Sequence, residues 1–524
     1  RRGLAACRGT PAPRSDQAQG RAIPAVGSAA PVASPRGPVT ISIIGTSDLH
    51  GAVGQLPILA GYVGNLRAAR QRDGGAVLLV DAGDMFQGTL ESNLNEGEAV
   101  IAAYNLIGYD AATVGNHELD FGPVGPAATA QVAADDPRGA LKARAVQARF
   151  PLLMANVDDA VTGRRVDWPN MPASVLLDKA GVSIGVIGVT TETTPFTTMP
   201  ANFVGLSMVP IAVTLAAEAT ALRGRGAEVI VVAAHAGSKC QVLADPDDTS
   251  SCDTEEEIFR VAEALPVGTV DVIVAGHTHA AMAHRVNGIA IIESYASGRA
   301  FGRVDLRVDE HGVVTEAAIH PPQELCRGVA GRCDPDDYEG AAVVAAAPVA
   351  GAIAGAVEQA RALRDEPLGV TLDSTIWKRF DAESPEGNLF TDLMLEVVPG
   401  ADVALTNGGG LRADLPAGPL TYGALYEAMP FDNRFAVVQV TGAQLRRMIV
   451  DDLHGAKAIF SWGGLRARAT CLRGDLRVVL TDRRGRTIKD DRTLRLVTSD
   501  FLASGGDGVI GRLALPEGAI DLDD

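Results

Sequence analysis

Five short segments of the chain carry aspartate, asparagine and histidine side chains that suit a divalent metal ion. These oxygen and nitrogen donors are hard or borderline ligands, which bind Mn, Fe, Zn, Co or Mg rather than metals that seek thiolates. Seven such side chains are more than one ion needs, so the set predicts two ions that share a bridging carboxylate. Two ions roughly 3.5–4 Å apart form the clamp used for in-line attack on phosphate esters. The segments are Ser47–Gly51, Gly83–Asp84, Gly115–Glu118, His235–Gly237 and Gly276–His279.

Each segment follows a short apolar run that is typical of a buried strand. In open α/β sheets, ligands bind at the carboxyl ends of strands, and a glycine beside each motif lets the backbone turn sharply. The alternative is ordinary strand-end turns with His and Asp as helix caps, which is credible for one segment but improbable for five in order. The runs are Val39–Ile44, Val77–Val80, Ala112–Val114, Val229–Ala233 and Val270–Val274.

The bulk properties limit the class of protein. The chain has 524 residues, enough for about two to four domains with sizeable cores. Its net charge of −18 argues against a nucleic acid polymer as partner, because such binding relies on phosphate neutralisation. An acidic chain can still take an anionic substrate where metals and a few arginines control the local field. Aromatic residues make up only 4%, so an exposed aromatic near a site calls for an explanation.

Residues 1–38 are rich in Pro, Ala, Arg, Gln and Ser and are expected to form a disordered leader or tether. Leu4-Ala5-Ala6-Cys7 resembles a bacterial lipobox, in which the cysteine is lipidated after signal cleavage. Because only three residues precede it, the match fits either a sequence clipped at its start or chance. A membrane tether through a lipidated Cys7 follows from the first interpretation only.

Four cysteines form two close pairs around polar loops, Cys240 with Cys252 and Cys326 with Cys333. This spacing predicts two local disulfides and an oxidising, extracytoplasmic compartment, either a periplasm or a bacterial cell surface. The alternative is two pairs of free thiols in a cytosolic protein. A metal role for these cysteines is not expected, because the hard-ligand set is complete without them. Cys471 is left unpaired.

The chain is expected to divide into two domains with a connector between them. The first domain, residues 39–320, alternates strands with helices at Ile58–Arg72 and Val209–Gly224 and closes with strands at Ile289–Glu293 and Arg303–Val308. Residues 321–366 follow as a Cys-bearing loop and a connector, and Glu339–Arg364 is expected to be helical despite its internal proline.

The second domain is expected over residues 367–524. The predicted elements are helices at Asn388–Val398 and Ala443–Leu453, strands at Asp402–Leu405, Phe435–Val440 and Leu494–Thr498, and a Gly-rich turn at Asn407–Gly410.

Together these motifs resemble the bifunctional metallophosphatase/5′-nucleotidase family, in which a calcineurin-like metallophosphoesterase domain is joined to a 5′-nucleotidase C-terminal domain. The resemblance implies an α/β fold: a four-layer α/β/β/α N-terminal domain, a connector helix and an α+β nucleotide-binding domain. It covers most of the chain from Val39 to Gly511. Its motifs are the five metal segments extended to Asp81–Asp84 and Gly115–Gly122, and in the second domain Gly387–Leu389, Asn407–Arg412, Pro430–Phe431 and Phe501–Gly508.

The resemblance also implies a role for each metal-binding side chain. The cofactors would be two divalent ions, of Zn, Mn, Co, Fe or Mg. Asp48, His50 and His279 would bind the first ion, Asn116, His235 and His277 the second, and Asp84 both.

His117 and Asp120 would be the catalytic pair. A histidine beside a metal-bound asparagine can reach phosphoryl oxygens or protonate a leaving group, and a carboxylate can keep the imidazole cationic and oriented. The alternative for Asp120 is a helix N-cap. Glu118→Ala is expected to matter far less than His117→Ala. His284 and His311 lie in no motif and are interpreted as surface residues.

The second domain would recognise the substrate. Phe431 and Phe501 resemble the pair that sandwiches the nucleobase, a contact worth about 1–3 kcal/mol per base, and the alternative is that both are core residues. Asp507 and Asn407 would contact the ribose, and Arg412 the phosphate. The family's first arginine would be Arg379, one residue out of place, with Lys378 as the fallback.

These assignments predict a 5′-nucleotidase, in which metal-bound water attacks the 5′-phosphorus in line and releases nucleoside and phosphate. The run Asp120-Phe121-Gly122 favours this branch. The alternatives are a nucleotide-sugar pyrophosphatase (UDP-sugar hydrolase), a 2′,3′-cyclic-nucleotide phosphodiesterase with 3′-nucleotidase activity, or a surface nucleotide-binding protein that is not an enzyme. The oligomeric state is not predicted.

Overall fold

The computed structural model describes residues 37–326, 333–380, 382–455, 460–472, 475–513, 515–516 and 518–522. The chain from Gly37 onward forms one compact unit. The leader predicted at the N-terminus, including Cys7, lies outside the described residues apart from its last two positions.

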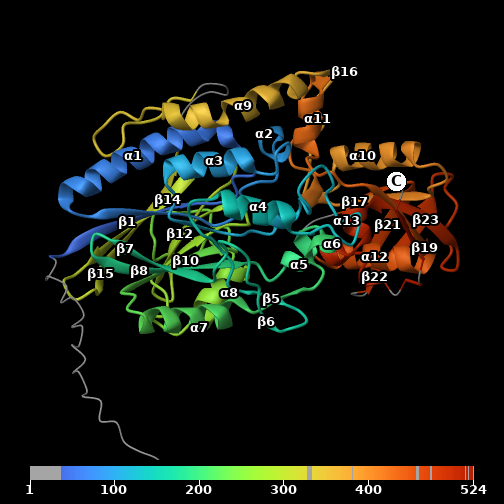
Figure 1. The fold of residues 1–524 in the computed structure, drawn as a ribbon. Helices are drawn as coiled ribbons and strands as arrows, with labels where there is room; N and C mark the ends of the chain where they lie inside the picture. The colour runs from blue at the N-terminus through green and yellow to red at the C-terminus, as the bar shows by residue number, and fades with distance from the viewer. Residues whose placement is uncertain are drawn as a thin grey trace, which may run out of the picture. The chain divides into compact units, whose positions relative to one another are not determined.

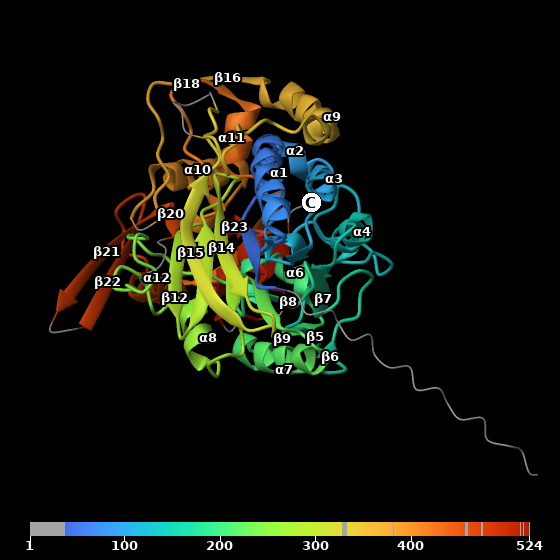
Figure 2. The same cartoon turned by 90° about the vertical axis from the view of Figure 1, so that its left-hand side faces the viewer.

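The N-terminal domain contains two six-stranded sheets (Figures 1 and 2). In the first sheet the order is β15-β14-β1-β2-β3-β4, and in the second it is β12-β13-β11-β10-β8-β7. The strands of the first are β1 (Val39–Thr46), β2 (Ala76–Asp81), β3 (Ala111–Thr113), β4 (Leu152–Leu153), β14 (Ala300–Val308) and β15 (Val314–Glu324). Those of the second are β7 (Ser174–Lys179), β8 (Val182–Thr190), β10 (Val229–His235), β11 (Val272–Ala275), β12 (Ala281–Val286) and β13 (Ile289–Ser294).

Side chains alternate between the two faces of these strands. The domain therefore has one core between the sheets and one on the outer face of each sheet. Ile41 and Ile43 of β1 point into the core between the sheets, together with Val231 of β10. Ile44 points to the opposite face, into a second core that Tyr62 shares. Because each sheet buries both faces, the strands read as nearly continuous apolar runs.

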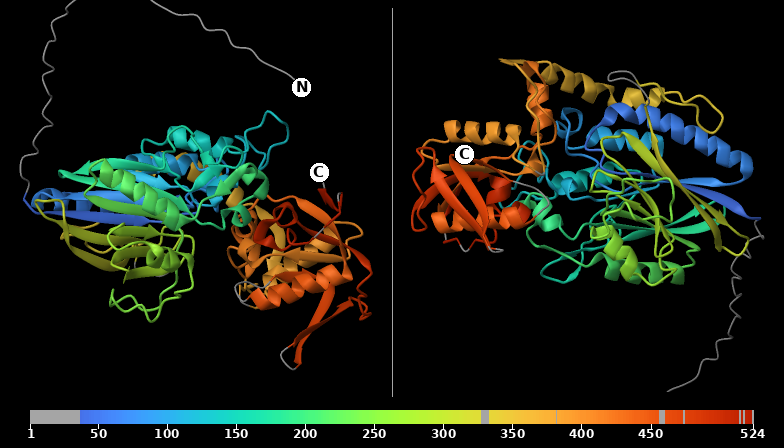
Figure 3. Two further views of the ribbon diagram at one scale, coloured as in Figure 1. Left: turned by 90° about the horizontal axis from the view of Figure 1, so that it is seen from below. Right: turned by 180° about the vertical axis from the view of Figure 1, so that it is seen from behind.

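Helices cover the outer faces and complete the predicted α/β/β/α layers. On the first sheet lie α1 (Leu56–Asp73) and α3 (Glu98–Ile107), and α9 (Ala347–Arg364) packs against the outer side of these two helices (Figure 1). On the second lie α7 (Ile211–Gly224) and α8 (Glu257–Ala264), which Figure 3 shows from below. The predicted connector helix is shorter than expected. It begins at Ala347, since Pro348 is tolerated in the first turn of a helix but not in its interior.

One central strand, β8, is absent from the sequence-based prediction. Its two glycines, Gly185 and Gly188, weaken the strand pattern. Both positions need glycine because the packing is close: a Cβ on Gly188 would lie 2.2 Å from the Cβ of Leu153, and one on Gly185 would lie 2.8 Å from Leu222. β8 pairs with β10 in parallel and so fixes the position of His235 at the end of β10.

The C-terminal domain is built on a five-stranded sheet of order β20-β17-β23-β19-β24. The predicted strands and both predicted helices are present, while the hairpin β21 (Leu465–Leu472) and β22 (Asp475–Asp482) was not predicted. The sheet strands are β17 (Val403–Thr406), β19 (Phe435–Thr441), β20 (Ser461–Gly463), β23 (Thr493–Ser499) and β24 (Ile520–Leu522), and the helices are α10 (Pro385–Val397) and α12 (Gly442–Gly455).

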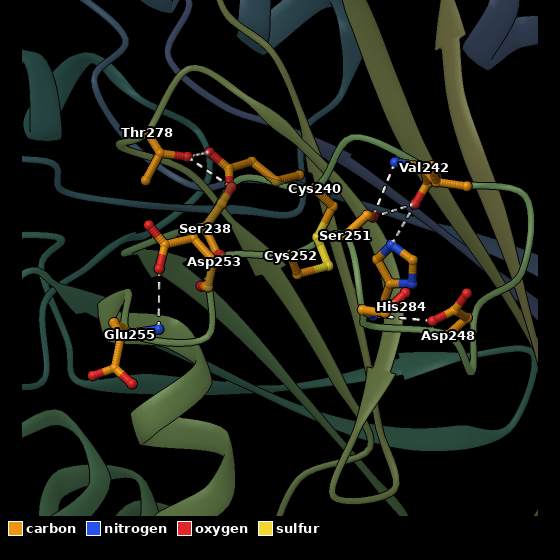
Figure 4. Close-up of a disulfide and its surroundings, with 12 residues drawn as sticks. Ser238, Cys240, Val242, Asp248, Ser251, Cys252, Asp253, Glu255, Thr278 and His284 are labelled. Carbon is orange, nitrogen blue, oxygen red and sulfur yellow. Dashed lines mark hydrogen bonds between the residues drawn. A yellow bond between two sulfur atoms is a disulfide. The ribbon is translucent and has the colours of Figure 1, made fainter. Parts of the chain in front are cut away.

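Both predicted disulfides are formed, Cys240–Cys252 and Cys326–Cys333, and Cys471 is a free, exposed thiol. The surface interpretation of His284 is wrong. Its side chain is fully buried on β12, beside the first disulfide, and its Nε2 bonds to the carbonyl of Val242 (Figure 4). His311 is exposed, as predicted. Within the described ranges, every helix is too short or too polar to cross a membrane.

Candidate active site

The five predicted ligand segments meet where strands of both sheets end. Three of them follow β1, β2 and β3 of the first sheet, and two follow β10 and β11 of the second. Backbone bonds join neighbouring segments: the N–H of Asp48 donates to Gly83 at 2.9 Å, and the N–H of His50 donates to Asp84 at 2.9 Å. The site therefore forms at the carboxyl ends of parallel strands, as ligand sites of open α/β sheets do.

The ligand atoms converge in two sets, and in each set they lie within 4.8 Å of one another. In the first, Nε2 of His50 and Nε2 of His279 are 2.9 Å apart. In the second, Nε2 of His235 lies 2.9 Å from Oδ1 of Asn116 and 3.2 Å from Nδ1 of His277. Such separations suit donors that each stand about 2.0–2.2 Å from one ion. The sets are Asp48, His50 and His279, and Asp84, His235 and His277.

Asp84 is placed to serve both sets. Its Oδ2 lies 3.1 Å from Nε2 of His235 and 3.9 Å from Nε2 of His50. Burial alone would raise the pKa of Asp84, but the positive charges of His235, His117 and His50 outweigh burial and hold it well below the usual range. Burial raises the pKa of Asp48 to about 7. Two buried carboxylates this close need nearby cations to stay ionised, which two metal ions would supply.

Backbone carbonyls fix which nitrogen of each histidine faces the centre. Nδ1 of His50 bonds to the carbonyl of Gln87, and Nδ1 of His235 bonds to that of Ala82, both at 2.8 Å. The carbonyls accept the Nδ1 hydrogen, so Nε2 faces the centre and can bind a metal ion once it has lost its own proton. Likewise Nδ2 of Asn116 donates to the carbonyl of Thr197 at 2.9 Å, which turns its Oδ1 inward. This outer layer is typical of metal sites.

The ligand backbone is strained. Five of the seven predicted ligands have positive φ: Asp48, His50, Asp84, His277 and His279. Left-handed backbone is uncommon for residues other than glycine, and it concentrates at functional sites where the surroundings enforce it. Glycines allow the segments to approach, since a Cβ on Gly115 would lie 2.2 Å from Oδ1 of Asp84.

His117 and Asp120 form a direct pair. Nδ1 of His117 lies 2.5 Å from Oδ2 of Asp120, and the N–H of His117 donates to Oδ1 of Asp84 at 2.9 Å. Burial lowers the pKa of His117, but the charges of Asp120 and Asp84 outweigh burial and raise it. Asp120 ends a short 3₁₀ turn, His117–Leu119, and caps no helix N-terminus, so the N-cap alternative is wrong. Its other oxygen accepts from Thr198 and from the N–H of Met199.

Two residues of the C-terminal domain reach this centre. Nη2 of Arg412 lies 3.2 Å from Nε2 of His50. The ring of Phe431 lies 5.6 Å from that of His117, and the guanidinium of Arg412 lies 5.8 Å from the Phe431 ring. A cation that suits phosphate and an aromatic face that suits a base thus stand beside the metal-ligand loops.

Asp507, another predicted substrate residue, lies close enough to the centre to interact with His117: burial raises the pKa of Asp507 overall, and the charge of His117 lowers it. Nδ2 of Asn407 donates to Oδ2 of Asp507 at 2.7 Å. Phe501 is half-buried against the C-terminal core, and a Cβ on Gly506 would meet its ring at 2.5 Å. Arg379 is exposed. The pKa of Lys378 is lowered, first by burial and then by the charge of Arg412, so the fallback Lys378 lies near the predicted phosphate-binding arginine.

The structure gives Glu118 a set of contacts that sequence reasoning did not predict. Its buried carboxylate accepts the backbone N–H of Asp84 at 2.8 Å, of Met85 at 2.6 Å, of Phe86 at 3.2 Å and of Gly115 at 2.6 Å. One side chain thereby joins the loops after β2 and β3. The signal in the sequence is its place inside the Gly115–Glu118 run, but the bond partners are set by tertiary structure.

Fold and site together define a metal-dependent phosphoesterase of the calcineurin-like class. Residues 41–281 match the calcineurin-like phosphoesterase family, and residues 360–512 match the 5′-nucleotidase C-terminal domain. Because the chain carries both of these domains, it belongs to the family of 5′-nucleotidases and UshA-like metallophosphoesterases.

Curated relatives match most of the chain. The endonuclease YhcR of Bacillus subtilis is 28% identical over 410 residues, which are 78% of this chain but 31% of that protein. Protein UshA of Yersinia enterocolitica is 27% identical over 508 residues, covering 89% of this chain and 86% of UshA. The 5′-nucleotidase of Vibrio cholerae is 26% identical over 517 residues, covering 89% and 85%. The chain therefore spans about a third of the first relative and most of the other two.

A solved structure has the same fold. The 5′-nucleotidase precursor from Thermus thermophilus superposes with a TM-score of 0.70 at 23% identity, and the match covers 91% of this chain and 93% of that chain.

Proposed function

We propose that this protein is a dinuclear 5′-nucleotidase that hydrolyses nucleoside 5′-monophosphates to nucleoside and phosphate. One observation carries the proposal: Arg412 and Phe431 of the second domain contact His50 and His117 of the first. A phosphate-binding cation and a base-stacking ring therefore lie next to the metal-ligand loops, within the span of one nucleotide. The 5′-nucleotidase of Vibrio cholerae, to which the chain is similar, supports the choice of substrate.

Two divalent ions would bind in the two ligand sets, with Asp84 shared and with Asn116 completing the second set. When bound, such ions polarise phosphoryl oxygens and lower the pKa of a bound water. The donor mixture suits Zn, Mn, Co, Fe or Mg. The converging nitrogens and the carbonyl-fixed histidines fit this pair of ions.

His117 would supply a proton or a hydrogen bond. Asp120 engages Nδ1, so Nε2 is the nitrogen that remains for the substrate. The raised pKa of His117 favours the protonated ring, which can stabilise charge on a phosphoryl oxygen or assist departure of the ribose 5′-oxygen. Asp120 would hold the ring in orientation, since Thr198 and Met199 fix its second oxygen.

The second domain would bind the nucleoside. Phe431, with Phe501, would stack on the base, and this contact tolerates any base. Asn407 and Asp507 form a polar pair that would turn to the ribose hydroxyls, while Arg412, assisted by Lys378 or Arg379, would bind the phosphate.

A second phosphoesterase activity on the same site is the alternative. The trifunctional nucleotide phosphoesterase YfkN of Bacillus subtilis is among the relatives, and metals and stacking residues would serve UDP-sugars or 2′,3′-cyclic nucleotides equally. Arg412 beside the metal loops favours a terminal phosphate, because a guanidinium binds it in bidentate fashion.

We also propose an extracytoplasmic location. Two disulfides favour an oxidising compartment, and the cell wall protein Lmo0130 of Listeria monocytogenes is a relative.

The test is phosphate release from AMP by metal-stripped full-length protein, with Mn, Co, Zn and Mg added back singly. His117→Ala is the test variant, and His311→Ala is its matched control, because His311 is exposed and lies in no motif. Activity that returns with metal, persists in the control and disappears in His117→Ala supports the proposal. Faster turnover of UDP-glucose or 2′,3′-cyclic AMP than of AMP would replace 5′-nucleotidase by the corresponding alternative.

A further inference from the structure

Glu293 is a buried acid for which the proposed function has no role. It lies on β13, its side chain is 1% exposed, and it is not one of the predicted ligands. Its Oε2 accepts the backbone N–H of Ser238 at 3.1 Å, and its Oε1 lies 2.7 Å from the hydroxyl oxygen of Thr278. Among the described residues, no Arg, Lys or His forms an ion pair with it. A buried carboxylate without a cation is costly.

The hydrogen bonds around Thr278 determine where the proton lies. The Thr278 hydroxyl oxygen is also 2.9 Å from the carbonyl oxygen of Ser238. A hydroxyl has one hydrogen, so it cannot donate both to that carbonyl and to an ionised Glu293. Both short contacts are satisfied if Glu293 carries a proton and donates it to Thr278, while Thr278 donates to Ser238.

The surroundings of Glu293 favour its protonated form independently of the hydrogen bonds of Thr278. A Cβ on Gly237 would lie 2.4 Å from Oε2 of Glu293, so the backbone presses against the carboxyl group and leaves no room for water on that side. Burial, and then the negative charge of Asp48, raise the pKa of Glu293 well above its ordinary value. Both effects penalise the ionised form.

Thr278 connects this carboxyl group to both metal sets. It stands between His277, which belongs to the second set, and His279, which belongs to the first. Both histidines have left-handed backbone, with φ of 79° and 56°, so the loop keeps this shape only if something holds it. Ser238 stands three residues after His235 of the second set, and Figure 4 shows it beside Thr278.

We propose that Glu293 is a positioning residue whose protonated carboxyl group donates to Thr278, accepts from Ser238, and so locks together the loops that carry His235, His277 and His279. The inference rests on the dinuclear centre of the proposed function, but not on which phosphoester is hydrolysed.

The test compares Glu293→Gln, Glu293→Leu, Thr278→Val and Thr278→Ser in the full-length protein, with Glu316→Gln as the matched control on the exposed part of β15. The readout is the rate at which Mn or Zn leaves the loaded protein for a chelator. An amide reproduces a protonated acid, with one donor and one acceptor, so Glu293→Gln should hold metal within about twofold of the wild type. Glu293→Leu and Thr278→Val should lose metal about 10- to 100-fold faster, the usual cost of an outer-layer change. Thr278→Ser keeps the hydroxyl and should restore retention.

The infrared difference spectrum of wild type minus Glu293→Gln gives a second readout that a merely structural role would not move. It should contain the carbonyl band of a protonated carboxylic acid. The proposal is overturned if Glu293→Gln loses metal as fast as Glu293→Leu, if the band is that of a carboxylate, or if Thr278→Val retains metal. Normal metal retention in Glu293→Gln without AMP hydrolysis by the wild type would overturn the proposed function and leave this inference standing.

Discussion

Backbone carbonyls orient three of the predicted metal ligands, whereas two of the predicted substrate residues are held by each other's side chains. His50, His235 and Asn116 each bond to a backbone carbonyl. Asn407, by contrast, bonds to the side chain of Asp507. Backbone partners are independent of side-chain identity, while side-chain partners can be exchanged one substitution at a time. The comparison teaches that the metal geometry is built into the first domain, and that recognition in the second can change without disturbing it.

Metal removal has the largest expected effect, because it acts on the metal-ligand loops of the first domain. Dialysis against a chelator should reduce AMP hydrolysis to background and lower the melting temperature, since metal ions would then no longer offset the charges of the buried Asp48 and Asp84. A phosphate-release assay measures the hydrolysis, and scanning calorimetry with and without Mn measures the melting temperature. An unchanged melting temperature would contradict the idea that ions stabilise these loops.

His117→Ala comes next. Loss of a positioned proton donor should lower kcat about 10²- to 10⁴-fold, with metal content unchanged, because His117 is not among the predicted ligands. Steady-state kinetics and metal analysis test it, and His311→Ala is the control. A parallel loss of metal would mean that the His117–Asp120 pair also holds the metal-ligand loops in place.

Glu118→Gln would disturb the contacts between the loops that follow β2 and β3. An amide nitrogen would replace a carboxylate oxygen that accepts backbone N–H groups, so donor would face donor. Metal affinity should fall about 10- to 100-fold, an effect on which the sequence makes no prediction. Metal titration is the measurement, and Glu316→Gln is the control. Wild-type affinity would show that the remaining loop bonds suffice.

Phe431→Leu would sharpen the comparison on the recognition side. Loss of stacking should weaken substrate binding by about 1 kcal/mol, which raises KM roughly fivefold. Metal affinity should stay unchanged. Kinetics on AMP and CMP should give similar losses, because stacking tolerates either base. A loss confined to one base would assign recognition to hydrogen bonds instead.

The smallest effects are expected for the two candidate phosphate-binding cations. Both side chains are exposed, but the pKa of Lys378 is lowered by desolvation and then by the charge of Arg412, which places Lys378 near the predicted phosphate-binding arginine. Lys378→Ala should therefore raise KM more than Arg379→Ala, which should change KM less than twofold. A larger effect of Arg379→Ala would instead support Arg379, the residue that the family pattern predicts.

The sequence predicts well which side chains converge at the strand ends, because these side chains follow strongly apolar strands in short motifs. It fails where the determinant is distant in the chain. Glu118 and the Thr197–Met199 segment act through tertiary bonds to backbone atoms, which leave no local pattern. The error at His284 has a different cause, because β12 is buried along most of its length and its polar residues look like surface residues. The centre of β8 was missed because glycines weaken its pattern.

If the predicted ligands bind ions, their left-handed backbone makes the lifetime of the protein depend on the supply of metal. Each strained position costs of order 1 kcal/mol or more, and five of them lie in loops that converge on one point. Without ions, those loops gain by relaxing, and relaxed loops open to proteases more often. On the proposed metal binding, a shortage of metal would lower the amount of this protein, because copies without metal would be degraded faster.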